Sequence, residues 1–232
     1  MTHKDIYEKF MIEYDKENVT TSYPSLTEYE IATLLDKAYL ALIAQKFTGN
    51  NTRKVPFEGD EKAVEDLQPL IRTTTSNVLS GTTLLGYFIY PLQSDVLYII
   101  SIMFTNADGT KLSSKQIHST DMYKFTKSVN NNPWSKLLMY CILNKLIIVA
   151  KDTLDYSNIV SPVEAVSAIY TYIKSPEKFV DENKLISLQD TILFELSDTM
   201  AEELINLALI MATEVVESPR LLTKAQLKGL ES

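Results

Sequence analysis

Apolar residues recur at three- and four-residue steps near both ends of the chain, which is the spacing of one helix face. The longest N-terminal run predicts an amphipathic helix of about six turns, ended by Gly49-Asn50-Asn51. A shorter run over residues 5–18, and another after the charged loop 53–60, predict two more helices. The apolar positions of the three runs are Ile6, Phe10, Met11 and Tyr14, then Ile31, Leu34, Leu35, Ala38, Tyr39, Leu42, Ile43 and Phe47, then Ala63, Val64, Leu67, Leu70 and Ile71.

Two capping boxes are possible at the start of the long helix, where a side chain satisfies an otherwise unpaired backbone N–H. Ser25 has Glu28 three residues later, and Thr27 has Glu30 at the same spacing. Both pairs fit the motif, so the helix is expected to begin at one of them. Its apolar face is expected to pack antiparallel against the helix over 63–71.

The middle of the chain is rich in β-branched and aromatic residues, which favour strands. Runs over 84–90 and 96–104 flank the turn formers of 91–95, which predicts that these two strands pair with each other. A second pair is predicted over 137–143 and 146–150, joined tightly at Asn144-Lys145. A further strand over 166–174 ends before Pro176, which lacks a ladder donor.

A polar stretch over 105–132 separates the two predicted strand pairs and reads as one long loop. A loop of this length is often functional. It is either a solvated surface loop or an arm that becomes ordered against a partner. Under the second interpretation the candidate interface residues combine lysines with the aromatic residues that interfaces favour. They are Lys111, Lys115, Tyr123 and Lys124 in the loop and Trp134 just after it.

A long amphipathic helix is predicted near the C-terminus, from about Asp198 to the stop at Pro219. Acidic residues at its start, including Glu202 and Glu203, are favoured there by the helix dipole. The same reason applies to Asp60-Glu61 at the start of an earlier helix. Residues 221–230 are expected to form a short final helix.

These elements predict an α+β fold in which N- and C-terminal helices pack together around a central antiparallel β region. The expected organisation is one composite domain. It has an N-terminal helical part over 1–80, a β-rich part over 81–180 that carries the loop 105–132, and a C-terminal helical part over 181–232 that returns to the first helices.

No pattern in the chain indicates catalysis or cofactor binding. The one cysteine, Cys141, has apolar neighbours and is expected to be a buried structural thiol. His3 and His118 are the only histidines, and the six glycines form no phosphate-binding loop. The sequence therefore predicts a protein that is not an enzyme, with no catalytic, cofactor-binding or metal-binding residues.

The formal net charge of −8 argues against a dedicated nucleic-acid binder, because such proteins neutralise phosphates with Lys and Arg. It is compatible with DNA passing by without specific binding. No run approaches the roughly 20 apolar residues of a membrane helix. The charged N-terminal stretch lacks the apolar core of a signal peptide, so we expect a protein made in a cytosol.

Several short segments resemble virion structural proteins of tailed phages, especially the crAss-like phages of gut Bacteroidetes. In order they are the helix from Leu26-Thr27-Glu28-Tyr29-Glu30-Ile31 to Ala44-Gln45-Lys46-Phe47, the motif Asn132-Pro133-Trp134, the strand end Tyr172-Ile173-Lys174-Ser175-Pro176, and the helix from Glu195-Leu196 to Glu217-Ser218-Pro219-Arg220.

The resemblance implies a component of the phage neck, of the kind that forms a ring under the portal and joins capsid to tail. It implies a homo-oligomer, expected to be a twelvefold ring, that binds the portal and/or neighbouring neck and tail proteins and surrounds the DNA conduit. The expected location is the virion neck or tail, after assembly in the cytoplasm of the bacterial host. The alternative is another phage interaction protein, capsid-associated or host-directed, that does not form a ring.

Overall fold

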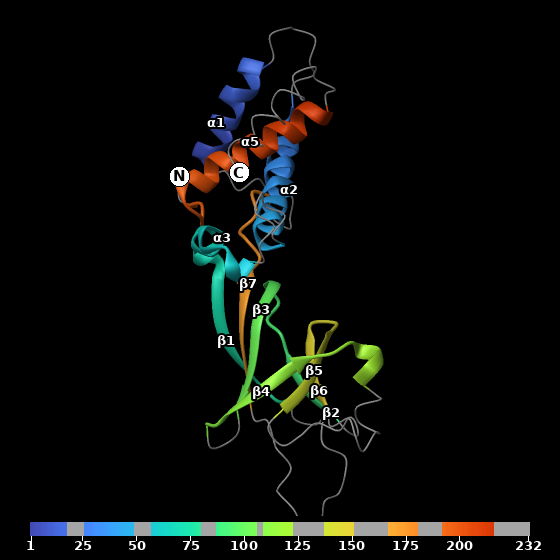
Figure 1. Cartoon of the computed structure of the whole chain (residues 1–232). Coiled ribbons are helices and arrows are strands. Elements are labelled where there is room, and N and C mark those ends of the chain that lie inside the picture. The colour runs from blue at the N-terminus through green and yellow to red at the C-terminus, as the bar shows by residue number, and fades with distance from the viewer. Residues whose placement is uncertain are drawn as a thin grey trace, which may run out of the picture. The chain divides into compact units, whose positions relative to one another are not determined.

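The chain folds into two compact units, a helical unit of Met1–Leu70 with Pro176–Ser232 and a β unit of Ile71–Ser175 (Figure 1). This is a computed structural model that describes residues 1–17, 26–48, 57–79, 87–105, 109–122, 137–150, 167–180 and 192–215. The presence of terminal helices and a mostly antiparallel sheet confirms the predicted α+β class.

The helical unit is built from segments at both ends of the chain. Its helices are α1 (His3–Glu17), α2 (Glu28–Phe47), α3 (Glu61–Leu67) and α5 (Asp198–Val215). As predicted, α5 returns to pack against α1 and α2. Their facing stripes exclude water and form the core of this unit, which includes the fully buried side chains Ile6, Phe10, Ile31, Leu35, Ile43, Met200, Leu204 and Ala208.

The start of α2 is fixed by the second of the two candidate capping boxes. Thr27 Oγ1 accepts a hydrogen bond from Glu30 N at 3.3 Å, and Thr27 N donates to Glu30 Oε2 at 2.8 Å. These bonds to Thr27 hold the pKa of Glu30 below its ordinary value. The other candidate, Ser25, lies outside the described residues. Asp60 caps α3 by accepting a hydrogen bond from Ala63 N at 3.4 Å.

The helix predicted over 63–71 is shorter than expected. The α-helical part ends at Leu67, a 3₁₀ turn follows over Gln68–Leu70, and Ile71 begins a strand. Pro69 explains the end of the α-helix, because a proline has no N–H to donate to the carbonyl four residues earlier. The boundary between the helical and β regions therefore lies at residue 70, ten positions before the predicted one.

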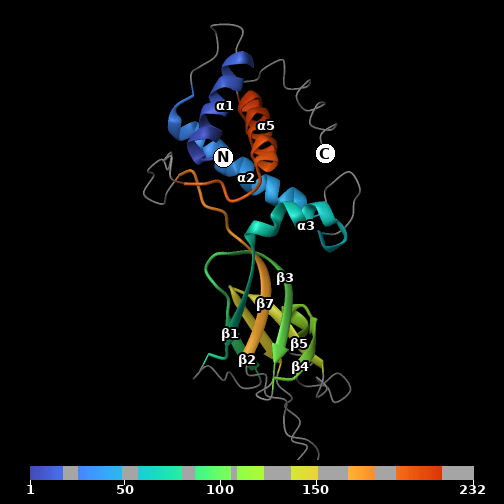
Figure 2. The same ribbon diagram turned by 90° about the vertical axis from the view of Figure 1, so that its left-hand side faces the viewer.

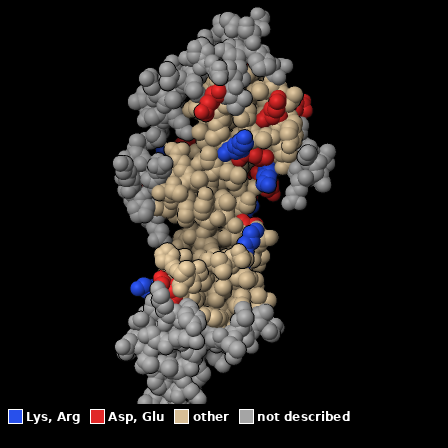
Figure 3. Space-filling view, turned by 90° about the vertical axis from the view of Figure 1, so that its right-hand side faces the viewer, with Lys and Arg blue, Asp and Glu red and all other residues tan. Residues whose placement is uncertain are grey.

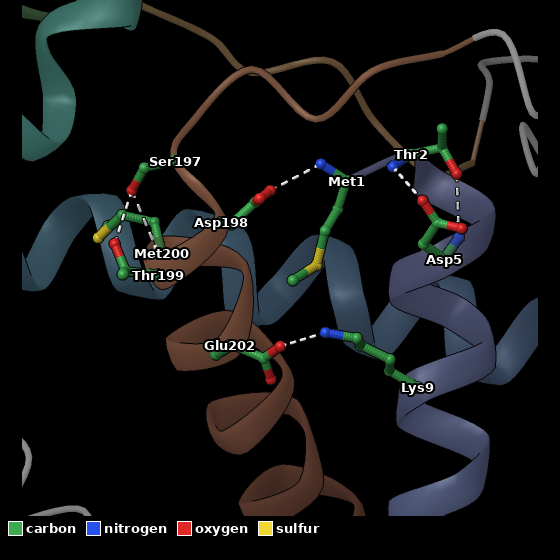
Figure 4. Close-up of polar contacts among 9 residues, drawn as sticks. All are labelled: Met1, Thr2, Asp5, Lys9, Ser197, Asp198, Thr199, Met200 and Glu202. Carbon is green, nitrogen blue, oxygen red and sulfur yellow. Dashed lines mark hydrogen bonds and ion pairs between the residues drawn. The ribbon is translucent and has the colours of Figure 1, made fainter.

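The first three residues of the chain are held against the segment that enters α5. His3 N donates to Ile192 O at 3.0 Å, and Phe194 N donates to Met1 O at 2.9 Å, as in a short antiparallel bridge. The terminal ammonium of Met1 pairs with Asp198 Oδ1 at 2.7 Å (Figure 4). Together these contacts join α1 to the start of α5.

The two adjacent acidic residues of α5 pair with lysines from two different helices. Glu202 pairs with Lys9 of α1 (Figure 4), and Glu203 Oε2 lies 3.1 Å from Lys46 Nζ of α2. Lys46 also pairs with Asp66 of α3 at 2.9 Å. Glu202 and Glu203 therefore link helices, a role that the helix-dipole explanation did not foresee. The α5 N-terminus itself is capped by Ser197, whose Oγ accepts from Met200 N at 3.4 Å.

The chain returns to the helical unit through a contact between Asp36 of α2 and two backbone amides. Phe179 N and Val180 N donate to its two carboxylate oxygens at 2.7 and 3.2 Å. Burial raises the pKa of Asp36, and these hydrogen bonds oppose the shift. The Phe179 ring stacks on His3 with ring centroids 4.1 Å apart, so this segment also packs against the start of α1.

The β unit is a curled sheet of seven described strands in the order β1-β7-β3-β4-β5-β6-β2, antiparallel except for the β4–β5 pair. Its two edge strands meet at one end, where Leu79 N donates to Ile89 O and Ser76 Oγ to Pro91 O. The strands are β1 (Ile71–Asn77), β2 (Tyr87–Pro91), β3 (Val96–Thr105), β4 (Lys111–Gln116), β5 (Leu137–Leu143), β6 (Leu146–Ala150) and β7 (Ser167–Lys174).

The strand pairing was predicted correctly in one case and wrongly in another. β5 and β6 form the expected hairpin, with Asn144 and Lys145 at φ of 51° and 59°, as a type I′ turn requires. The expected pairing of the 84–90 and 96–104 runs is wrong, because β2 pairs with β6 while β3 lies between β7 and β4. The predicted loop 105–132 is also wrong in part, since it contains β4.

The inner face of the curled sheet holds a continuous apolar core. Phe104 lies at its centre, with its ring centroid 5.7 Å from those of Tyr90 and Tyr140. Cys141 is buried beside Met122 in a smaller cluster, which confirms the expected burial, and this burial raises the pKa of its thiol. The main core comprises Tyr90, Ile102, Phe104, Leu112, Leu138, Tyr140, Ile147, Val149, Ala168, Tyr170 and Tyr172.

Two buried tyrosines, one in each unit, give a matched test of these cores. The hydroxyl of Tyr39 in α2 has no hydrogen-bond partner among the described residues, whereas that of Tyr170 accepts from Gln93 N at 2.9 Å. We expect Tyr39→Phe to leave the free energy of unfolding unchanged or raise it by up to about 1 kcal/mol, and Tyr170→Phe to lower it by about 1 kcal/mol. Urea denaturation of both variants measures this, and equal losses would contradict it.

Candidate protein interface on the β unit

The structure places two of the five candidate interface residues and brings those two onto one strand. Lys111 and Lys115 are exposed on β4, on the side opposite the buried Leu112. They belong to a strand face and not to a loop, which corrects the sequence interpretation. Tyr123, Lys124 and Trp134 lie outside the described residues.

The two lysines belong to a larger surface, because side chains alternate between the two faces of a strand. On β1, β7, β3 and β4, every second residue points away from the core described above. β7 lies between β1 and β3, in front of β5 and β6 in the view of Figure 2. Ile71 and Ile173 also fall on this side, but Ile173 is fully buried. We call the remaining part of this surface the outer face; it comprises Thr73, Thr75, Asn77, Ser167, Ile169, Thr171, Ser101, Met103, Thr105, Lys111, Ser113 and Lys115.

The strand register aligns the outer face into rows that run across the sheet. One row is Asn77–Ser167–Thr105–Lys111, the next is Thr75–Ile169–Met103, and the third is Thr73–Thr171–Ser101. The hydroxyls of Thr105 and Ser167 lie 2.6 Å apart, and those of Thr73 and Thr171 lie 3.1 Å apart. These cross-strand pairs hold the outer rows in fixed positions.

The outer face carries very little charge for an exposed sheet. Its only charged members are Lys111 and Lys115, both at the β4 margin, and its middle row holds the apolar residues Met103 and Ile169. Met103 is 39% exposed. Depletion of charge at the centre with charged groups at the margin is typical of protein–protein interfaces. The composition of the outer face therefore suits the binding of another protein.

The two units differ strongly in net charge. The segment 71–175 contains nine Lys and Arg residues and six Asp and Glu residues, which gives the β unit a net charge of +3. Because the whole chain has a net charge of −8, the helical unit has a net charge of −11. The positive charge is concentrated in the segment 109–136, which contains five lysines and a single acidic residue, Asp121. On the side drawn in Figure 3, acidic and basic side chains lie beside one another in several places, and large areas carry no charge.

Within the part of the chain that the structure describes, no group of three or more His, Cys, Asp or Glu side chains could hold a metal ion. Over the same residues, no helix is long and apolar enough to cross a membrane. The tyrosines with the most strongly raised pKa values, Tyr39 and Tyr90, owe the shift to burial in a core.

No known protein-family model matches the chain, and comparison with characterised proteins gave no significant match.

Sequence reasoning found the two lysines but missed the surface to which they belong. The signal is a run of small polar residues, Thr73-Thr74-Thr75-Ser76-Asn77 in β1, together with Ser167 and Thr171 in β7. Strands are ordinarily recognised by their apolar positions, so β1, which has few of them, was not predicted. Its threonines, whose β-branched side chains favour extended backbone, were the available indication.

Proposed function

We propose that this protein is a virion structural protein, a subunit of the head-to-tail connector, or neck, ring of a tailed phage. It binds the portal or an adjacent ring, and it lines or surrounds the conduit through which the genomic DNA passes without specific binding. Its place is the neck or tail of the virion, which is assembled in the cytoplasm of the bacterial host. In this role the protein is not an enzyme and uses no cofactor.

The observation that carries the proposal is that one chain presents two dissimilar surfaces on separate units. The β unit has a charge-poor outer face with lysines at one margin, and the helical unit is strongly acidic. Subunits that associate through two different surfaces form a ring when the rotation closes. A ring of twelve copies would match a twelvefold portal. An acidic protein around the conduit repels the DNA backbone and so does not hold it.

The copy number of this protein in purified virions tests the proposal. Quantitative mass spectrometry of particles from the phage that encodes it measures the ratio of this chain to the portal protein. We expect a ratio of one or a simple multiple of one. A copy number that follows the major capsid protein would favour a capsid-associated protein, and absence from the particle would contradict any structural role in the virion.

A further inference from the structure

We propose that the outer face is the site at which the helical unit of a second copy of this chain binds. The inference rests on the proposed ring function, because a ring requires each subunit to bind the next through two different surfaces. It goes further by naming both surfaces and the charges that orient them.

The first argument is the composition of the outer face. Twelve side chains from four adjacent strands include two apolar residues in the middle row and no charge except Lys111 and Lys115. Four of its hydroxyl groups already pair with one another, which lowers the desolvation cost of covering this surface. A protein surface can therefore cover Met103 and Ile169 without leaving a charge buried and unpaired.

The second argument is charge complementarity between the two units. The lysines at the β4 margin belong to the most basic part of the chain, and the helical unit of any copy holds a net charge of −11. Two β units, each with a net charge of +3, repel one another, as do two helical units. Association of a β unit with the helical unit of another copy is therefore the electrostatically favoured arrangement, and it leads to head-to-tail growth.

Acidic side chains for this contact are available on the helical unit. Glu61 and Glu65 are exposed on α3 at the i, i+4 spacing that places them on one side of the helix, and Glu8 and Asp15 are exposed on α1. By contrast, Glu202 and Glu203 already pair with lysines of their own copy.

The test compares two full-length variants that place a glutamate at an exposed apolar position of the β unit. Met103→Glu puts the charge in the middle row of the outer face. Leu143→Glu puts it at the end of β5, outside the outer face, where the native side chain is 47% exposed. Circular dichroism establishes that both variants fold, and analytical ultracentrifugation measures self-association. We expect Met103→Glu to weaken self-association at least tenfold and Leu143→Glu to leave it unchanged within about twofold.

Mixing the Met103→Glu variant with the wild-type protein tests the head-to-tail arrangement. The variant keeps an intact helical unit, so it is expected to bind the outer face of a wild-type copy and end the growing chain. An excess of the variant should therefore convert larger wild-type assemblies into small ones. Interfaces formed by the same surface on both copies predict instead that the variant is simply excluded from wild-type assemblies.

Zero-length carbodiimide cross-linking of a mixture of ¹⁴N- and ¹⁵N-labelled protein identifies which surface of the second copy binds the outer face. We expect mixed-isotope cross-links from Lys111 or Lys115 to carboxylates of the helical unit, and their loss in the Met103→Glu variant, which keeps both lysines. Cross-links from these lysines only within one copy, or only to another β unit, would overturn the inference. So would a wild-type protein that stays monomeric at the highest concentration reached, or a Met103→Glu variant that associates like wild type.

The test of this interface and the test of the neck assignment can fail independently of each other. Loss of association in Met103→Glu, with no copies of the protein in virions, would keep this interface and reject the neck assignment. A copy number that is a simple multiple of that of the portal, with a Met103→Glu variant that assembles normally, would keep the neck assignment and reject this interface.

Discussion

Replacing Phe104 with alanine is expected to lower the free energy of unfolding of the β unit by about 3–5 kcal/mol. The Phe104 ring is fully buried at the centre of the sheet core, between the rings of Tyr90 and Tyr140. Truncation removes its apolar contacts and leaves a cavity that the surrounding strands, fixed by their ladders, fill only in part. Urea denaturation of the full chain, followed by circular dichroism at a wavelength dominated by strands, measures the loss.

The adjacent residue supplies the control. Met103 lies on the same strand with its side chain on the outer face, so Met103→Ala is expected to change the free energy of unfolding by less than about 0.5 kcal/mol. If both variants unfolded at the same urea concentration, the assignment of inner and outer faces on β3 would be wrong.

Replacing Lys46 with methionine is expected to lower the free energy of unfolding of the helical unit by about 2–3 kcal/mol. Lys46 connects α2 to Asp66 of α3 and Glu203 of α5, and all three side chains are largely shielded from water. The variant leaves two shielded carboxylates close together without a cation. Chemical denaturation of wild type and variant at pH 7 measures the difference.

The same variant has an expected pH dependence. Burial alone lowers the pKa of Lys46, but the hydrogen bonds and charges of Asp66 and Glu203 together raise it above the ordinary value. A raised lysine pKa contributes stability that is fully present below about 10.4, the pKa of an unfolded lysine, and is lost as the pH rises through the folded pKa. The difference between wild type and Lys46→Met should therefore shrink at pH 11.

The control for this prediction is Lys9→Met. The Lys9–Glu202 pair also links two helices, but both of its side chains are more than 40% exposed. Water and salt screen an exposed pair, so this variant is expected to lose much less stability than Lys46→Met. Equal losses would mean that the shielding of the Lys46 cluster contributes nothing.

The sequence predicted correctly those elements that depend on interactions between residues close together in the chain. The capping box at Thr27 and Glu30, the apolar stripe of α2 and the turn at Asn144-Lys145 each depend on residues within a few positions of one another, and the structure contains all three. The burial of Cys141 followed in the same way from its apolar neighbours.

Features that depend on distant residues were not predictable in this way. The partner of β2 is β6, nearly sixty residues later, and nothing in the 91–95 turn indicates that choice. Acidic residues are favoured at a helix start, and this local rule already accounts for Glu202 and Glu203. Nothing in the sequence therefore indicated that they also pair with Lys9 and Lys46. β4 was assigned to a loop because its one buried apolar residue, Leu112, shows no alternation by itself.

The β unit is inserted between the two segments that make up the helical unit, and this has a consequence for synthesis on the ribosome. All seven described strands have been translated by residue 174, whereas α5 begins only at residue 198. The middle of the chain can therefore fold first, as domains commonly do during translation. Until α5 emerges, α1 and α2 lack the helix that covers their apolar faces, so these two helices, although translated before the β unit, reach their final packing after it.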